Sequence, residues 1–105
     1  MIALQARSSI RVLLVEDHRM VAAGLSLVLE EASDVEVVRI ADGRRALAEL
    51  PESVEPDVVL MDFRLSDGEG PEAAEQARHR WAETAVVFLS ADDSEEAVLD
   101  AVQAG

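Results

Sequence analysis

Apolar residues in this chain gather in four short runs, and a stretch with helical spacing follows each run. The runs at residues 10–15, 58–61 and 85–89 are nearly continuous in apolar side chains, as expected for strands buried on both faces of a sheet. Residues 35–40 also read as a strand. The order βαβαβαβα predicts an α/β fold, a doubly wound parallel sheet with helices on both faces.

The helical segments are recognised by the spacing of their apolar residues and by the residues at their ends. The first carries the stripe of an amphipathic helix at Val21, Leu25, Val28, Leu29 and Ala32. Pro51 helps to end the second segment, and Pro71 begins the third, which we expect to run to about Trp81. The fourth covers residues 93–104. We expect the strand order 2-1-3-4, in which the order of the strands reverses between the first and third strands.

The length and composition place the chain in the class of single-domain proteins with an aliphatic core. It has 105 residues, of which 50% are hydrophobic but only 3% are aromatic. The absence of cysteine excludes a disulfide framework and thiolate metal sites. No apolar stretch approaches the roughly 20 residues of a membrane span, and nothing at the N-terminus reads as a signal peptide. We therefore expect a cytoplasmic protein without a membrane partner, in which residues 1–9 form a leader.

The charge narrows the choice of partners. The net charge is −13, from 22 acidic and 9 basic residues, so the chain alone should not bind nucleic acid. Such a chain suits a protein that concentrates carboxylates around a cation or meets a basic partner. All nine basic residues are arginines, and there is no lysine.

Polar side chains follow the strands at the point where each strand ends. Glu16 and Asp17 follow the first strand, Asp62 follows the third and Ser90 follows the fourth. In doubly wound sheets, ligands bind beyond the carboxyl ends of the strands where strand order reverses, so these residues should converge. Any one acid at a strand end is more often a loop residue, and Asp17 alone could simply cap the first helix. Four polar groups at matching strand ends favour a site.

Three clustered carboxylates call for a compensating cation. They would raise one another's pKa without one, and oxygen ligands indicate a hard ion, Mg²⁺ or Mn²⁺. A carboxylate beside such an ion is a plausible nucleophile towards phosphorus, and Ser90 can donate a hydrogen bond to a phosphoryl oxygen. We expect His18 in the first turn of the first helix, partly exposed at the rim of the site, rather than as a ligand.

Three segments resemble the receiver domains of bacterial two-component response regulators: RVLLVEDH, PDVVLMDFRLSDGEG and AVVFLSA. The resemblance is greatest to the NarL/FixJ (LuxR-type) subfamily and covers about residues 10–105. It implies the flavodoxin-like receiver fold of five βα units, of which this chain contains four. Two departures are the serine at position 66, where the family usually has proline, and the missing fifth strand, fifth helix and lysine. Residues 10–105 of this chain therefore read as a receiver domain that is truncated at its C-terminus and lacks the fifth strand and helix.

The resemblance assigns a role to each residue of the expected site. Asp62 corresponds to the phosphoacceptor, Ser90 to the hydroxyl that binds the phosphoryl group, and Ala91 to the small residue that makes room for it. The Mg²⁺ ligands implied are Glu16, Asp17, Asp62 and the main-chain carbonyl of Arg64. A receiver is not an enzyme beyond its own phosphorylation and dephosphorylation. Its implied partners are a sensor histidine kinase, a second copy in a homodimer, and DNA through a C-terminal domain absent from this chain.

Three other interpretations stay open. A pseudo-receiver folds alike but acts as an interaction module without phosphorylation; the intact acids and Ser90 argue against it, whereas the missing lysine does not. An aspartate-nucleophile phosphatase usually has a second acid two residues after the nucleophile, where this chain has Arg64, and needs a lysine. A flavodoxin-like cofactor protein would need a phosphate loop rich in hydroxyls and glycine after the first strand.

Overall fold

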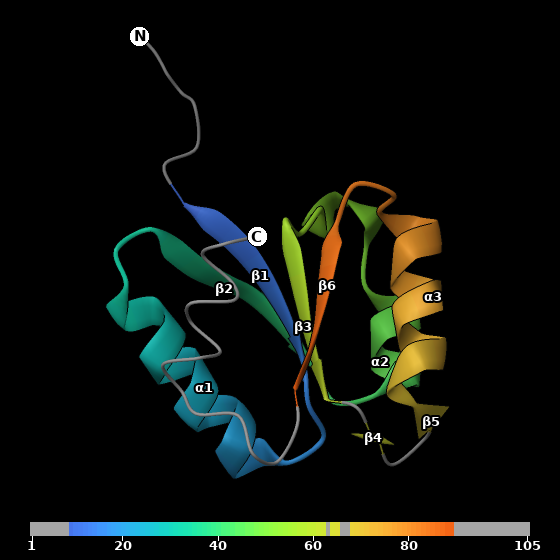
Figure 1. Ribbon diagram of the computed structural model, residues 1–105, viewed down its shortest axis with the longest axis horizontal. Coiled ribbons are helices and arrows are strands. Elements are labelled where there is room, and N and C mark those ends of the chain that lie inside the picture. The colour runs from blue at the N-terminus through green and yellow to red at the C-terminus, as the bar shows by residue number, and fades with distance from the viewer. Residues whose placement is uncertain (1–8, 63, 66–67, 90–105) are drawn as a thin grey trace, which may run out of the picture.

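The computed structural model describes residues 9–62, 64–65 and 68–89, and these contain a four-stranded parallel sheet (Figure 1). Its strands are β1 (Ile10–Val15), β2 (Val35–Ala41), β3 (Val58–Asp62) and β6 (Ala85–Leu89). They lie in the order β2-β1-β3-β6, so the predicted order 2-1-3-4 and the α/β fold class are confirmed. The second and third strands are each one residue longer than the hydrophobic runs indicated.

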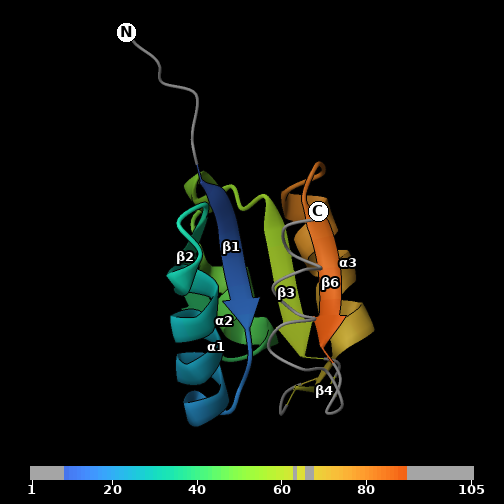
Figure 2. The same ribbon diagram turned by 60° about the vertical axis from the view of Figure 1, so that its left-hand side comes forward.

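Helices cover both faces of the sheet. The described helices are α1 (Arg19–Glu31), α2 (Arg44–Glu49), the 3₁₀ turn η1 (Glu52–Val54) and α3 (Gly70–Arg80). Figures 1 and 2 show α1 on one face, with α2 and α3 on the other. Within the described residues, no helix combines the length and the apolar character needed to cross a bilayer.

The core follows from the alternation of side chains along the central strand. Val12 and Leu14 of β1 are fully buried and pack on the side of α1, together with Leu29. Leu13 and Val15 face the opposite side, towards α2 and α3. Because successive strand residues point to opposite faces, a run of apolar residues is needed to fill both layers. This is why the central strands read as continuous apolar runs in the sequence.

Two short elements were not predicted. One is η1, and the other is a two-stranded antiparallel sheet of β4 (Arg64–Leu65) and β5 (Gly68–Glu69) directly after β3. Each involves only two or three residues in a strand or turn, too few to show a hydrophobic period. The helix predicted at residues 93–104 lies outside the described residues.

Candidate functional site at the carboxyl edge of the sheet

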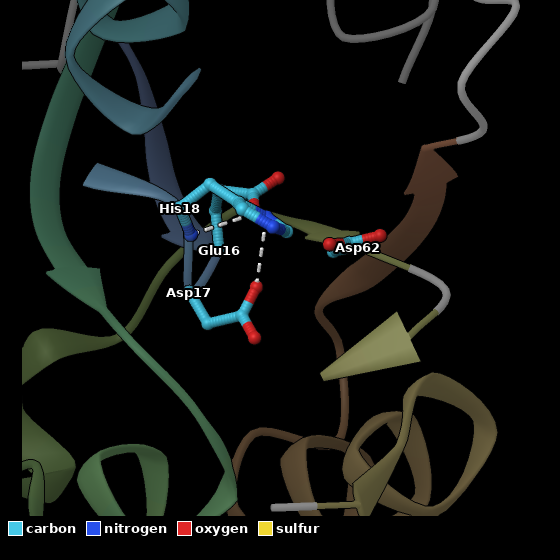
Figure 3. Close-up of side chains that lie close together, drawn as sticks. All are labelled: Glu16, Asp17, His18 and Asp62. Atoms are coloured by element: carbon cyan, nitrogen blue, oxygen red, sulfur yellow. Dashed lines mark hydrogen bonds and ion pairs between the residues drawn. The ribbon is translucent and has the colours of Figure 1, made fainter. Parts of the chain in front are cut away.

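The register of β1 and β3 brings the acidic residues together. The two strands are parallel neighbours, and Val15 pairs with Met61, the last residue before Asp62. Glu16 and Asp17 continue from β1 at the same edge. One ligand atom from each of Glu16, Asp17, His18 and Asp62 can be chosen so that all four lie within 4.8 Å of one another (Figure 3). The predicted convergence of three carboxylates from two strands is confirmed.

The acidic cluster differs in burial from one member to the next. Glu16 is buried, with 5% of its surface exposed, whereas the side chain of Asp17 is 15% exposed. Burial raises the pKa of the Glu16 carboxyl, hydrogen bonds from His18 lower it, and the charge of Asp62 raises it further. Burial and like charge thus work against ionisation of this carboxyl. A divalent cation would reverse that effect.

His18, which we expected in the first turn of the helix at the rim of the site, instead precedes the helix and belongs to the cluster. It precedes α1 at the N-cap and makes no capping hydrogen bond with its side chain. The interpretation of Asp17 as the helix cap is therefore wrong. The ring Nδ1 of His18 lies 2.9 Å from Oε2 of Glu16 and 3.1 Å from Oδ1 of Asp17. The hydrogen bond to Glu16 and the charges of both acids raise the pKa of His18, although its side chain is 70% exposed.

The donor set fits a divalent metal ion. Three carboxylates from two segments, the ends of β1 and β3, offer the oxygen ligands that Mg²⁺ and Mn²⁺ take in proteins. Their crowding, and the raised pKa of buried Glu16, are the electrostatic conditions that a cation relieves. The residues present therefore suit the ion expected from the sequence.

The remaining predicted site residues, which the structure describes less fully, are Arg64, Ser90 and Ala91. Arg64 is the first residue of β4, two positions after Asp62. Leu89 ends β6 and pairs with Asp62, so the fourth strand reaches the same edge as the third. Ser90 and Ala91 lie outside the described residues, and their placement stays a prediction.

An open hollow borders the acidic pair on the side of β2. It has a volume of about 680 Å³ and lies between the start of α1, the end of β2 and α2. Its lining residues are Glu16, Asp17, Arg19, Ala22, Ala23, Ile40, Asp42 and Ala46. Two of the three clustered acids, Glu16 and Asp17, thus border open space, whereas Asp62 does not line this hollow.

A parallel sheet with three acids gathered at its carboxyl edge defines the class of receiver-like α/β proteins. The chain belongs to the response regulator receiver domain family, which its sequence matches over residues 12–105. This matched range includes all four residues of the acidic cluster. The cluster therefore lies where the family resemblance placed the site.

Individual relatives agree with this family. The chain is 38% identical over 98 residues to the response regulator protein VraR of Staphylococcus aureus strain NCTC 8325; the match covers 92% of this chain and 46% of that protein. The chain thus spans about half the length of such relatives. The receiver domain of the putative response regulator NarL from Mycobacterium tuberculosis has a TM-score of 0.82 and 25% identity, with 92% and 95% of the two chains covered. The NarL/FixJ-type recognition is confirmed by these two relatives.

The fold is shared more widely. The receiver domain of the PhyR response regulator of Erythrobacter litoralis superposes with a TM-score of 0.81 at 20% identity, covering 92% of this chain and 89% of that one. At such identity the likeness concerns the fold alone. The chain is thus the receiver domain of a two-component response regulator, a class of signalling module that typically is not enzymatic.

Proposed function

We propose that this receiver accepts a phosphoryl group on Asp62 from a sensor histidine kinase, in a Mg²⁺-dependent reaction that switches the output of its regulator. The observation that carries the proposal is the convergence of Asp62 with Glu16 and Asp17 within 4.8 Å. No pattern within β1 or β3 alone requires that arrangement.

The acids would have separate tasks in this reaction. Glu16, Asp17, Asp62 and the main-chain carbonyl of Arg64 would hold Mg²⁺ or Mn²⁺. When bound, the cation supplies positive charge against the phosphoryl oxygens. Asp62 is the carboxylate at the end of a strand, partly exposed and next to the acidic pair. Its position supports the role of nucleophile.

The transfer itself exchanges one bond for another. A carboxylate oxygen of Asp62 forms a bond to phosphorus while the N–P bond of the kinase phosphohistidine breaks. The kinase imidazole leaves with the electron pair of that bond and takes a proton from solvent. The Ser90 hydroxyl would hydrogen-bond to a phosphoryl oxygen, and the small side chain of Ala91 would leave room for the group. The receiver catalyses only its own phosphorylation and the later hydrolysis of the acyl phosphate.

The output is a further part of the proposal. Because the chain spans about half the length of the VraR relatives, the natural protein is proposed to act on transcription through a C-terminal DNA-binding domain. A cytoplasmic location and pairing of two receivers in a homodimer belong to the same proposal.

Incubation with acetyl phosphate and Mg²⁺, followed by intact-mass measurement, tests the chemistry. The chain should gain one phosphoryl group that is labile to hydroxylamine, and EDTA should prevent the gain. Asp62→Asn should abolish it, because the amide is not a competent nucleophile. Asp42→Asn is the matched control: Asp42 is exposed just after β2 at the same edge, and its substitution should leave labelling unchanged.

Two results would contradict the proposal. Labelling that persists in Asp62→Asn would place the phosphoryl group elsewhere. Mg²⁺ binding without any labelling, either by acetyl phosphate or by the phosphorylated kinase, would identify a pseudo-receiver that acts without phosphorylation.

A further inference from the structure

His18 adds a nitrogen donor to an otherwise all-oxygen cluster. Its ring Nδ1 lies within hydrogen-bonding distance of Oε2 of Glu16 and Oδ1 of Asp17, at 2.9 and 3.1 Å. Figure 3 shows the ring directed from the end of β1 towards Asp62. One ligand atom from each of the four side chains can be chosen so that all lie within 4.8 Å.

Local backbone geometry holds the ring in this position. The His18 backbone N–H donates a hydrogen bond to Oε2 of Glu16 at 3.0 Å, the same oxygen that the ring approaches. Because the Glu16 side chain is only 4% exposed, its position is restricted, and Oε2 holds both the backbone N–H and the ring of His18 in place. The ring itself is 70% exposed and makes no capping bond to α1. Neither core packing nor helix capping accounts for its placement.

An imidazole changes which cations a carboxylate site prefers. Mg²⁺ takes oxygen ligands and retains several waters, so a nearby nitrogen adds little to its binding. Zn²⁺ binds His nitrogen together with Asp and Glu oxygens and is usually four-coordinate. Three carboxylates and one imidazole therefore match the ligand number and type that Zn²⁺ takes.

We propose that His18 is a fourth side-chain ligand of this site, beside the three carboxylates, and gives it a preference for divalent cations that bind imidazole, Zn²⁺ above all, over Mg²⁺. The inference rests on the proposed function, because it assigns a further property to the same site. Zn²⁺ binds the neutral imidazole, so a proton held on the coordinating ring nitrogen would pass to solvent.

The distances permit such a site after small movements. Ligand atoms around a tetrahedral Zn²⁺ at about 2.1 Å are about 3.4 Å apart. Pairs now separated by up to 4.8 Å would therefore have to approach by about 1.4 Å at most. Side-chain rotation of exposed His18 and partly exposed Asp62 can supply this movement without a change in the sheet.

Calorimetric titration with Mg²⁺ alone and with Zn²⁺ alone tests the proposal. His18→Ala should lower the Zn²⁺ affinity at least about tenfold, since even the loss of an outer-shell partner costs about 10–100-fold. Its Mg²⁺ affinity should change by less than about threefold. The matched control is His79→Ala: His79 is the chain's other histidine, exposed in the last turn of α3, and its substitution should change neither affinity.

Long-range ¹H–¹⁵N spectra of the unsubstituted chain provide a second readout that needs no site variant. Zn²⁺ should shift a ring nitrogen resonance of His18 strongly, whereas Mg²⁺ at saturation should leave it close to its metal-free position. The His79→Ala spectrum assigns the two imidazoles.

The outcomes separate this inference from the proposed function. Equal Zn²⁺ affinity in His18→Ala and the unsubstituted chain, or ring nitrogens that do not respond to Zn²⁺, would overturn the role of His18 while Mg²⁺ binding and Asp62 labelling stand. Failure of the unsubstituted chain to bind Mg²⁺ or to be labelled would instead count against the proposed function.

Discussion

The two edges of the parallel sheet use polar residues in opposite ways. At the amino edge, hydrogen bonds hold such side chains in place: the backbone N–H of Arg11 donates to Oδ2 of Asp57 at 2.8 Å, and the Thr84 hydroxyl donates to the Pro56 carbonyl at 2.6 Å. At the carboxyl edge, three carboxylates crowd together with one exposed imidazole. The first arrangement joins elements, whereas the second gathers like charges.

Helix ends show how thoroughly the amino edge is hydrogen-bonded. The Arg80 guanidinium at the end of α3 donates to the carbonyls of Leu47, at 2.8 Å, and Leu50. These carbonyls belong to the last turn of α2 and its C-cap, where a helix leaves acceptors without partners. Trp81 Nε1 donates to the Glu52 carbonyl at 3.0 Å, and the Arg80 guanidinium lies 4.8 Å from the Trp81 ring centroid. This edge stabilises the fold.

The contrast indicates where stability and where chemistry reside in a receiver. Hydrogen-bonded charges add to the free energy of unfolding, whereas crowded carboxylates reduce it until a cation binds. Functional sites are the places where a protein is expected to keep unfavourable arrangements, such as crowded like charges. Substitutions at the two edges should therefore have different consequences.

The largest effect on stability is expected from Arg80→Ala. The substitution leaves carbonyls of α2 without their cationic donor, so the free energy of unfolding should fall by about 2–3 kcal/mol. Urea unfolding measures this, and phosphorylation of the folded fraction should be unchanged. Arg78→Ala, an exposed arginine in the same helical turn, is the control and should cost less than about 0.5 kcal/mol. Similar losses for both arginines would refute the structural role of the amino edge.

Mg²⁺ should have the next largest effect, and only through the carboxyl edge. At ten to a hundred times its Kd, a bound ion raises the free energy of unfolding by about 1.4–2.7 kcal/mol. Asp17→Asn should abolish most of this gain and, without metal, should be no less stable than the unsubstituted chain because it removes a like charge. Unfolding curves with and without Mg²⁺ test both statements. A large loss of metal-free stability in Asp17→Asn would show that the acids serve the fold.

A smaller effect is expected from Thr84→Val at the amino edge. Valine keeps the shape of threonine but cannot donate to the Pro56 carbonyl, so about 1 kcal/mol of unfolding free energy should be lost. The stabilisation by Mg²⁺ should be the same as in the unsubstituted chain. A reduced response to Mg²⁺ would mean that the two edges are coupled through the sheet.

The smallest effect should be a gain from Gly24→Ala in α1. A Cβ at this position meets no atom within 4 Å, and alanine favours a helix over glycine by about 0.5–1 kcal/mol. Thermal unfolding should show the gain, with Mg²⁺ affinity and Asp62 labelling unchanged. An altered Mg²⁺ affinity would show that stability and site chemistry are not separable in this domain.

Much of the fold could be predicted because its signals are local. Buried parallel strands require apolar side chains on both faces, which is why the runs ending at Val15, Met61 and Leu89 predicted their strands to within one residue. The acids of the site were identified because they come directly after the apolar runs that end at Val15 and Met61. The β4–β5 pair and η1 were missed, since two or three residues carry no periodicity.

The sequence by itself determined the order of the elements and which polar residues end the strands, since side-chain alternation and helical spacing depend on neighbours along the chain. Only the tertiary structure decided that the imidazole of His18 lies against Glu16 and Asp17, and that Arg80 reaches the end of α2. Such contacts depend on side-chain rotamers and on how separate elements pack together. No local pattern encodes either of them.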